Sequence, residues 1–185
     1  MTQGVTVRTM SGSDTHQLPT PAQFARVAAL LGREPRGLRD IPVVDDAGDP
    51  VVIRVASLVD GKPFPTLYWL LGAELCLRID RLEAAGWILR LQARVDASHE
   101  LRASMSDDHA RHKAERARFL SAEEQQLLES RGMLGALNER GIGGIADPDR
   151  IRCLHTWYAA HLVTPNTIGR MVDTLLSDGE YLAPD

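Results

Sequence analysis

Two β-branched runs flank a polar turn in the stretch Ile41-Pro42-Val43-Val44-Asp45-Asp46-Ala47-Gly48-Asp49-Pro50-Val51-Val52-Ile53-Arg54-Val55-Ala56. Val and Ile favour strands, and turn residues between two such runs are typical of a β-hairpin. A second turn, Asp60-Gly61-Lys62-Pro63, leads into the run from Phe64 to Leu71, whose aromatic content and lack of charge are typical of a buried strand. These segments predict a small, mainly antiparallel sheet over about residues 41–71.

Helical patterns flank this sheet on both sides. Thr20 and Pro21 fit an N-cap and a first helical position, apolar residues follow at helical spacing, and Gly32 supplies the end. From Ala73 onward an apolar stripe predicts further helices, with an interruption at Gly86. The remaining elements are, in order, a charged helical stretch over about 98–120, a short helix from Ser121 to Leu128 that begins with a capping box, a glycine-rich loop over 131–145, a helix that begins at Asp147-Pro148 and ends at Pro165, and a last helix over about 166–176.

The predicted fold class is α+β, with the small antiparallel sheet packed against five or six helices in a single domain over residues 21–177. A chain of 185 residues, 44% of them hydrophobic, is long enough for one domain with its own core. The first twenty residues are rich in Ser, Thr and Gly, so we expect residues 1–20 to be a disordered tail. Residues 178–185 are expected to be a short polar tail.

Composition excludes several classes of protein. The longest stretch without Asp, Glu, Lys, Arg or His, Pro63 to Ala73, is far shorter than the roughly 20 apolar residues of a membrane helix. The N-terminus lacks the pattern of a secretory signal and two distant cysteines make no disulfide framework, so we expect a cytoplasmic protein with free thiols. A net charge of −4 disfavours general binding of nucleic acid.

The segment Arg140-Gly141-Ile142-Gly143-Gly144-Ile145-Ala146-Asp147 is the sharpest local signal in the chain. Glycines let backbone N–H groups approach a ligand closely ahead of the positive end of a helix. The segment matches neither a P-loop nor the dinucleotide-binding fingerprint, and Asp147 would repel a nearby phosphate. Two interpretations stay open, a turn whose glycines serve only the backbone geometry and a loop that binds an anion.

Cys153-Leu154-His155 and His161 fall in one predicted helix and suggest a second candidate site. In a regular helix Cys153 and His155 would diverge by about 200° and could not ligate one metal ion. A Cys-x-His without a second close pair is a weak match to a zinc site, so no metal site is predicted. Cys153 is either a nucleophile with His155 or His161 as general base, or a buried structural cysteine.

Two further groups of polar residues can be interpreted either as ordinary surface residues or as functional ones. His109 and His112 lie on one face of the charged helix, either as surface residues or as a pair for acid–base or metal chemistry. Arg33 and Arg36 lie in a loop with Pro35, where they are either solvated or bind a phosphate or carboxylate.

Six short segments, taken in their order along the chain, carry a resemblance to a known family. They are Leu31-Gly32-Arg33-Glu34-Pro35-Arg36-Gly37, Asp60-Gly61-Lys62-Pro63-Phe64-Pro65-Thr66-Leu67-Tyr68-Trp69-Leu70, Arg81-Leu82-Glu83-Ala84-Ala85-Gly86, Gly141-Ile142-Gly143-Gly144-Ile145, Arg152-Cys153-Leu154-His155 and Asn166-Thr167-Ile168-Gly169. In these segments, which span about residues 24–170, the chain resembles the bacterial domain-of-unknown-function 501 family.

The resemblance implies a set of polar positions and no established activity. His109 and Arg116 match a helical His and Arg of the family, and His161 matches a His that follows the Cys-Leu-His element. Many relatives carry Cys-Pro where this chain has Asp45-Asp46, so a cysteine-based metal site that spans hairpin and helix is not implied here. Relatives also carry Asn-Pro at Asn166-Thr167. The positions singled out are Arg33, Arg36, His109, Arg116, Cys153, His155, His161 and Asn166.

The leading functional hypothesis is a protein that binds a small molecule or anion, without an identified cofactor. In this hypothesis Arg33, Arg36, Arg140 and the Gly141 to Gly144 loop converge near His109 and the Cys-Leu-His element. One alternative is a hydrolase or transferase that uses Cys153 with a histidine, for which no third triad member can be assigned from spacing. The other is an adaptor that binds a protein partner through the charged helix, Ser98 to Leu120.

Overall fold

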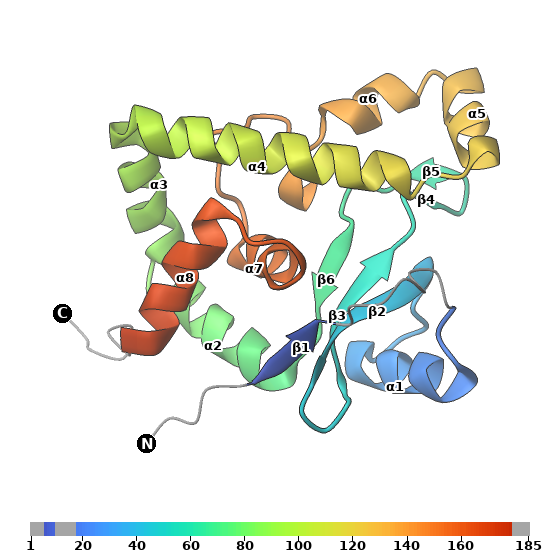
Figure 1. The fold of residues 1–185 in the computed structure, drawn as a ribbon. Helices are drawn as coiled ribbons and strands as arrows, with labels where there is room; N and C mark the ends of the chain where they lie inside the picture. Colours follow the sequence, from blue (N-terminus) through green and yellow to red (C-terminus); the bar gives the residue numbers. More distant parts are fainter. Residues whose placement is uncertain (1–5, 10–17, 179–185) are drawn as a thin grey trace.

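The computed structural model describes residues 6–9 and 18–178. Its main sheet has the strand order β1-β2-β3-β6 with every neighbouring pair antiparallel, which confirms the predicted sheet (Figure 1). At the hairpin between β2 and β3, Asp45 Oδ1 accepts the N–H groups of Ala47 and Asp49, and Gly48 has a φ of 86°. The strands are β1 (Val7–Thr9), β2 (Leu38–Asp45), β3 (Pro50–Val55), β4 (Leu58–Val59), β5 (Lys62–Pro63) and β6 (Tyr68–Leu70), of which β4 and β5 form a separate two-stranded ladder.

The predicted strand from Phe64 to Leu71 is longer than the strand that forms. Only Tyr68–Leu70 pairs with β3, because Pro65 has no N–H to donate and the residues before Tyr68 run irregularly. Leu67 and Tyr68 are nevertheless buried, as predicted for this apolar run.

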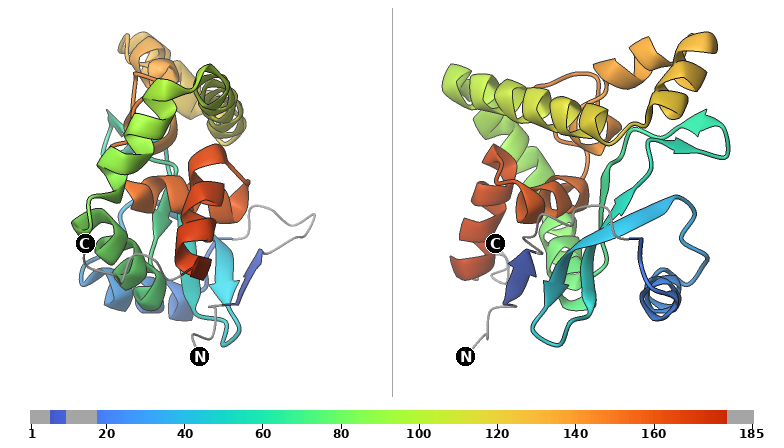
Figure 2. Two further views of the ribbon diagram at one scale, coloured as in Figure 1. Left: turned by 90° about the vertical axis from the view of Figure 1, so that its left-hand side faces the viewer. Right: turned by 45° about the vertical axis from the view of Figure 1, so that its right-hand side comes forward.

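The sheet carries helices on both faces. Val27 of α1 packs with Ile53, Val55 and Leu71 on one face, while Trp157 lies in the larger core on the other. Figure 1 and the right-hand view of Figure 2 both place α1 across the sheet from α7 and α8. The helices are α1 (Pro21–Leu31), α2 (Ala73–Ala84), α3 (Trp87–Ala97), α4 (His99–Arg118), α5 (Ala122–Ser130), α6 (Leu134–Glu139), α7 (Leu154–Val163) and α8 (Thr167–Asp178), with a 3₁₀ turn η1 (Ile142–Gly144) before α7.

The predicted helix caps at the two sharpest boundaries are confirmed. Thr20 and Ser121 each form a capping box with the residue three positions on, and Gly32 ends α1 in the left-handed conformation. The described residues hold eight α-helices rather than five or six, partly because the break at Gly86 separates α2 from α3 and because α6 forms inside the predicted loop over 131–145.

The predicted start of the helix at Asp147-Pro148 is wrong. Asp147 Oδ1 accepts the N–H of Asp149 in a local turn, and α7 begins seven residues later, at Leu154. Side chains of two other helices hold the intervening backbone, since Gln92 Oε1 accepts from Ile151 N at 2.9 Å and Glu83 Oε1 accepts from Leu154 N at 2.6 Å. Tertiary hydrogen bonds therefore override the local helix signal.

Two further predictions need correction. Val7–Thr9, in the tail that we expected to be disordered, forms β1 and pairs with β2. The rest of the predicted tails, residues 1–5, 10–17 and 179–185, lies outside the described residues. The interpretation of His109 and His112 as surface residues is also wrong, because Asp108, His109, His112 and Arg116 are buried along one face of α4. None of the helices in the described ranges is long and apolar enough to cross a membrane.

Arg116 is the most deeply buried charge on that face, with 1% of its surface exposed. Its guanidinium donates to the carbonyl oxygens of Pro65, Leu137 and Arg140, at 3.1, 2.6 and 2.6 Å. Arg116 therefore joins α4 to the segment before β6 and to the loop after α6.

We predict that Arg116→Ala lowers the free energy of unfolding by about 3 kcal/mol or more, because buried carbonyl groups lose a charged donor. The measurement is urea unfolding followed by circular dichroism. The exposed Arg118 lies two residues further along the same helix, and Arg118→Ala should change the stability by no more than about 0.5 kcal/mol. Equal effects of the two substitutions would contradict the role given to Arg116.

Candidate functional site

The glycine loop is built around His109. His109 Nδ1 accepts the backbone N–H of Ile142 at 2.9 Å, and its ring lies edge-on against Trp157 with 4.9 Å between the centroids. A Cβ atom on Gly141 would lie 2.0 Å from His109 Nδ1, so only glycine fits there. Gly143 and Gly144 have φ values of 68° and 71°. The backbone-geometry interpretation of this loop is therefore the one that the contacts favour.

His161 and Asn166 organise the turn between α7 and α8. Asn166 Nδ2 donates to Trp157 O at 2.9 Å, and its Oδ1 accepts from Gly169 N at 2.7 Å. His161 Nδ1 accepts the N–H of Asn166, and its Nε2 lies 2.8 Å from a carboxylate oxygen of Asp173. These contacts engage both ring nitrogens of His161 in holding the turn.

The described residues show no contact that brings the predicted arginines together around one anion. Arg33 lies over the ring of Trp69, which packs in the core cluster that α1 covers, and Arg36 forms an exposed ion pair with Asp60 at 3.2 Å. Arg116 holds backbone carbonyls instead of an anion, as described above. Arg140 is exposed and donates to the carbonyl of Gly144 at 3.4 Å.

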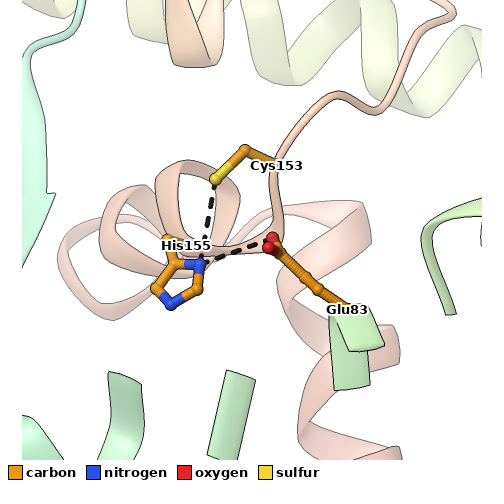
Figure 3. Close-up of side chains that lie close together, drawn as sticks. All are labelled: Glu83, Cys153 and His155. Atoms are coloured by element: carbon orange, nitrogen blue, oxygen red, sulfur yellow. Dashed lines mark hydrogen bonds and ion pairs between the residues drawn. The ribbon is translucent and has the colours of Figure 1, made fainter. Parts of the chain in front are cut away.

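Cys153 and His155 do come together, and Glu83 of α2 joins them (Figure 3). Cys153 Sγ lies 3.9 Å from His155 Nδ1, and Glu83 Oε1 lies 3.4 Å from the same nitrogen. The ligand atoms of these three residues all lie within 4.8 Å of one another. On the other side of the ring, His155 Nε2 lies 3.3 Å from Asp80 Oδ1.

The expected divergence of Cys153 and His155 by about 200° does not occur. Cys153 is the N-cap of α7 and has an extended backbone, with φ −156° and ψ 125°. The 100° rotation per residue therefore does not apply between Cys153 and His155, and the extended backbone lets the thiol lie 3.9 Å from His155 Nδ1.

The surroundings of His155 favour its protonated form. The hydrogen bond with Cys153 is the largest influence and, with the negative charge of Glu83, raises the pKa of His155 to about 9, while burial acts in the opposite direction. The imidazole ring is thus positively charged at neutral pH.

Asp80 and Glu83 were missed by the sequence analysis. The two residues are three apart in α2, so they share a helix face. That spacing is the only sign of them in the sequence, because their partner in the fold, His155, lies more than seventy positions away in the chain.

The structure is that of an α+β protein with a Cys–His–carboxylate cluster at the start of α7. A family described as "Protein of unknown function (DUF501)" matches residues 41–174, and the chain belongs to that family, as the resemblance implied. No curated protein and no solved structure matches this chain.

His112, on the buried face of α4, makes a pH dependence testable. It is 5% exposed, and burial, followed by the charges of Arg116 and His109, lowers its pKa to about 3. The unfolded chain therefore binds a proton between about pH 6.5 and pH 3 that the folded protein does not bind.

We predict that the contribution of His112 makes stability fall as the pH is lowered through this window, with a slope that approaches about 1.4 kcal/mol per pH unit. His112→Gln should reduce the slope of unfolding free energy against pH, as measured by denaturant unfolding between about pH 7 and pH 4. His99→Gln, which changes an exposed histidine of the same helix, is the control and should leave the slope as it is. An unchanged slope in His112→Gln would refute the prediction.

Proposed function

We propose that the protein is a thiol-dependent enzyme in which Cys153 is the nucleophile of an acyl-transfer or hydrolytic reaction. The observation that carries this proposal is the order of contacts across one imidazole ring. The thiol lies 3.9 Å from Nδ1 and the Asp80 carboxylate lies 3.3 Å from Nε2. A nucleophile, a base and a group that orients the base are the parts that such catalysis requires. Asp80 is thus the third member that spacing could not assign.

The position of Cys153 also supports a nucleophilic role. It occupies the N-cap position of α7, a helix of ten residues, at the positive end of the helix dipole. Its side chain is partly exposed, so a substrate can reach it.

The proposed reaction has two steps. In the first, the Cys153 sulfur attacks as a thiolate whose proton His155 Nδ1 already holds, and it forms a bond to the acyl carbon while the leaving group takes that proton from the ring as its own bond to the carbon breaks. In the second, water or another acceptor attacks the thioester carbon and gives its proton to His155. Cleavage of the sulfur–carbon bond then restores the thiolate beside the protonated ring.

A groove beside this segment supports a substrate with an anionic group. It has a volume of about 470 Å³ and is lined by three arginines, Arg140, Arg150 and Arg152, by Asp147, which forms an ion pair with Arg150, and by apolar side chains of α3, among them Leu89. Arg152 directly precedes Cys153 in the chain. A substrate with an anionic group and an apolar part is the class that such a lining suits. The adaptor hypothesis draws less support, because α4 buries one of its polar faces.

We predict that iodoacetamide modifies Cys153 at least about 100-fold faster than Cys76 at neutral pH, since a positioned base is worth about 10² to 10⁴ in rate. Cys76 is the matched control within the same chain, because burial, followed by the charge of Asp80, raises its pKa to about 11. Peptide mass spectrometry over a time course reports both rates. His155→Gln should slow modification of Cys153 at least about tenfold.

An acyl donor tests the reaction itself. Incubation with p-nitrophenyl acetate should release nitrophenolate and leave a transient acetyl group on Cys153, which Cys153→Ser abolishes and Cys76→Ser does not. Equal modification of the two cysteines, or release that survives Cys153→Ser, would exclude the proposed enzyme.

A further inference from the structure

Glu83 is one group more than thiol chemistry requires. Asp80 already orients His155 through Nε2, yet the Glu83 carboxylate lies on the same side of the ring as the thiol, 3.4 Å from Nδ1. A carboxylate beside a reactive sulfur opposes the formation of a thiolate, because two negative charges then share one space. A cation between them would remove this conflict.

We infer that Glu83, Cys153 and His155 form a Zn²⁺ site with three protein ligands. This inference goes beyond the proposed enzyme and does not require Cys153 to be a nucleophile. In the part of the chain that the structure describes, these residues are a set of three different donor types whose ligand atoms lie within 4.8 Å of one another. Figure 3 shows the sulfur, Nδ1 and the carboxylate facing a common point.

The distances fit a tetrahedral ion. With Zn–S near 2.3 Å and Zn–N and Zn–O near 2.0–2.2 Å, a tetrahedral site has an S–N edge of about 3.6 Å and an N–O edge of about 3.4 Å. The observed separations are 3.9 Å from Cys153 Sγ to His155 Nδ1 and 3.4 Å from Glu83 Oε1 to His155 Nδ1. A movement of the sulfur by a few tenths of an ångström would complete the S–N edge, and the S–O separation, which lies within 4.8 Å, would have to close to about 3.6 Å.

The groups around the three ligands hold them in position. Asp80 Oδ1 lies 3.3 Å from His155 Nε2, where a carboxylate favours a proton on Nε2 and so keeps the Nδ1 lone pair for a metal, as carboxylates do behind histidine ligands of zinc. Leu154 N donates to Glu83 Oε1 at 2.6 Å, so the carboxylate is held in one orientation. The site is half-buried, and three protein ligands leave a fourth position for water or a substrate atom.

The donor set selects the ion. A thiolate and an imidazole suit Zn²⁺, whereas Mg²⁺ and Ca²⁺ take oxygen ligands almost exclusively. Because the metal would bind the Cys153 sulfur, zinc would also protect this thiol from modification.

Titration calorimetry of the chelator-treated full chain with Zn²⁺ is the test. We expect one Zn²⁺ per chain, at least a tenfold loss of affinity in Cys153→Ser and in His155→Gln, and a smaller loss in Asp80→Asn. Cys76→Ser changes the other cysteine of the chain and should bind zinc like the unchanged protein. Circular dichroism confirms that each variant is folded.

Glu83→Gln separates the zinc site from the thiol reaction. Glutamine keeps an oxygen that accepts from Leu154 N but removes the anionic ligand, so zinc affinity should fall at least tenfold while Cys153 in metal-free buffer is still modified faster than Cys76. If this variant does not fold, Cys153→Ser and His155→Gln carry the same test of affinity.

The outcomes distinguish the two proposals. No zinc binding at micromolar metal, or unchanged affinity in both Cys153→Ser and His155→Gln, would overturn the zinc site and leave the reactivity of Cys153 to stand on its own test. Zinc binding that Cys153→Ser abolishes, in a protein whose Cys153 is no more reactive than Cys76, would support the metal site and exclude the enzyme.

Discussion

The hydrogen bond from Leu154 N to Glu83 Oε1, 2.6 Å long, is the contact on which the candidate site depends. It joins α2 to the first residue of α7 and sets where the helix begins. Gln92 holds the backbone just before Leu154 in the same way, since its amide accepts from Ile151 N and donates to Asp149 O. The backbone before α7 is thereby extended, Cys153 becomes an N-cap, and its thiol reaches His155. A helix that began at Asp147 would have separated these side chains.

The polar residues that the resemblance singled out fall into two sets. His109 and Arg116 hold backbone groups of the loop between α6 and α7, and His161 and Asn166 hold the turn after α7. Most of their polar atoms therefore serve the fold. Cys153 and His155 differ, because their contacts lead to one another and to the carboxylates of α2. The chemistry is thus concentrated at one end of α7.

Much of the fold could be predicted from local signals. The hairpin after Ile41, the capping boxes at Thr20 and Ser121 and the end of α1 at Gly32 each follow from residues a few positions apart. The start of α7 and the burial of α4 could not, because both depend on hydrogen bonds between distant segments. The Cys–His pair was visible in the sequence, but a regular helix was assumed there, and in a regular helix the two side chains would diverge. Glu83 and Asp80 could not be found from the sequence, because they lie in a helix more than seventy residues earlier.

The central claim is that Glu83 and Cys153 meet at one nitrogen of His155. Long-range ¹H–¹⁵N correlation spectra of the histidine rings test it most directly, because the Nδ1 and Nε2 shifts report their immediate partners. The account predicts that Cys153→Ser and Glu83→Gln each move the Nδ1 signal of His155, whereas Cys76→Ser leaves it in place and none of the three moves the signals of His161. A His155 signal that responds to neither Cys153→Ser nor Glu83→Gln would contradict the account.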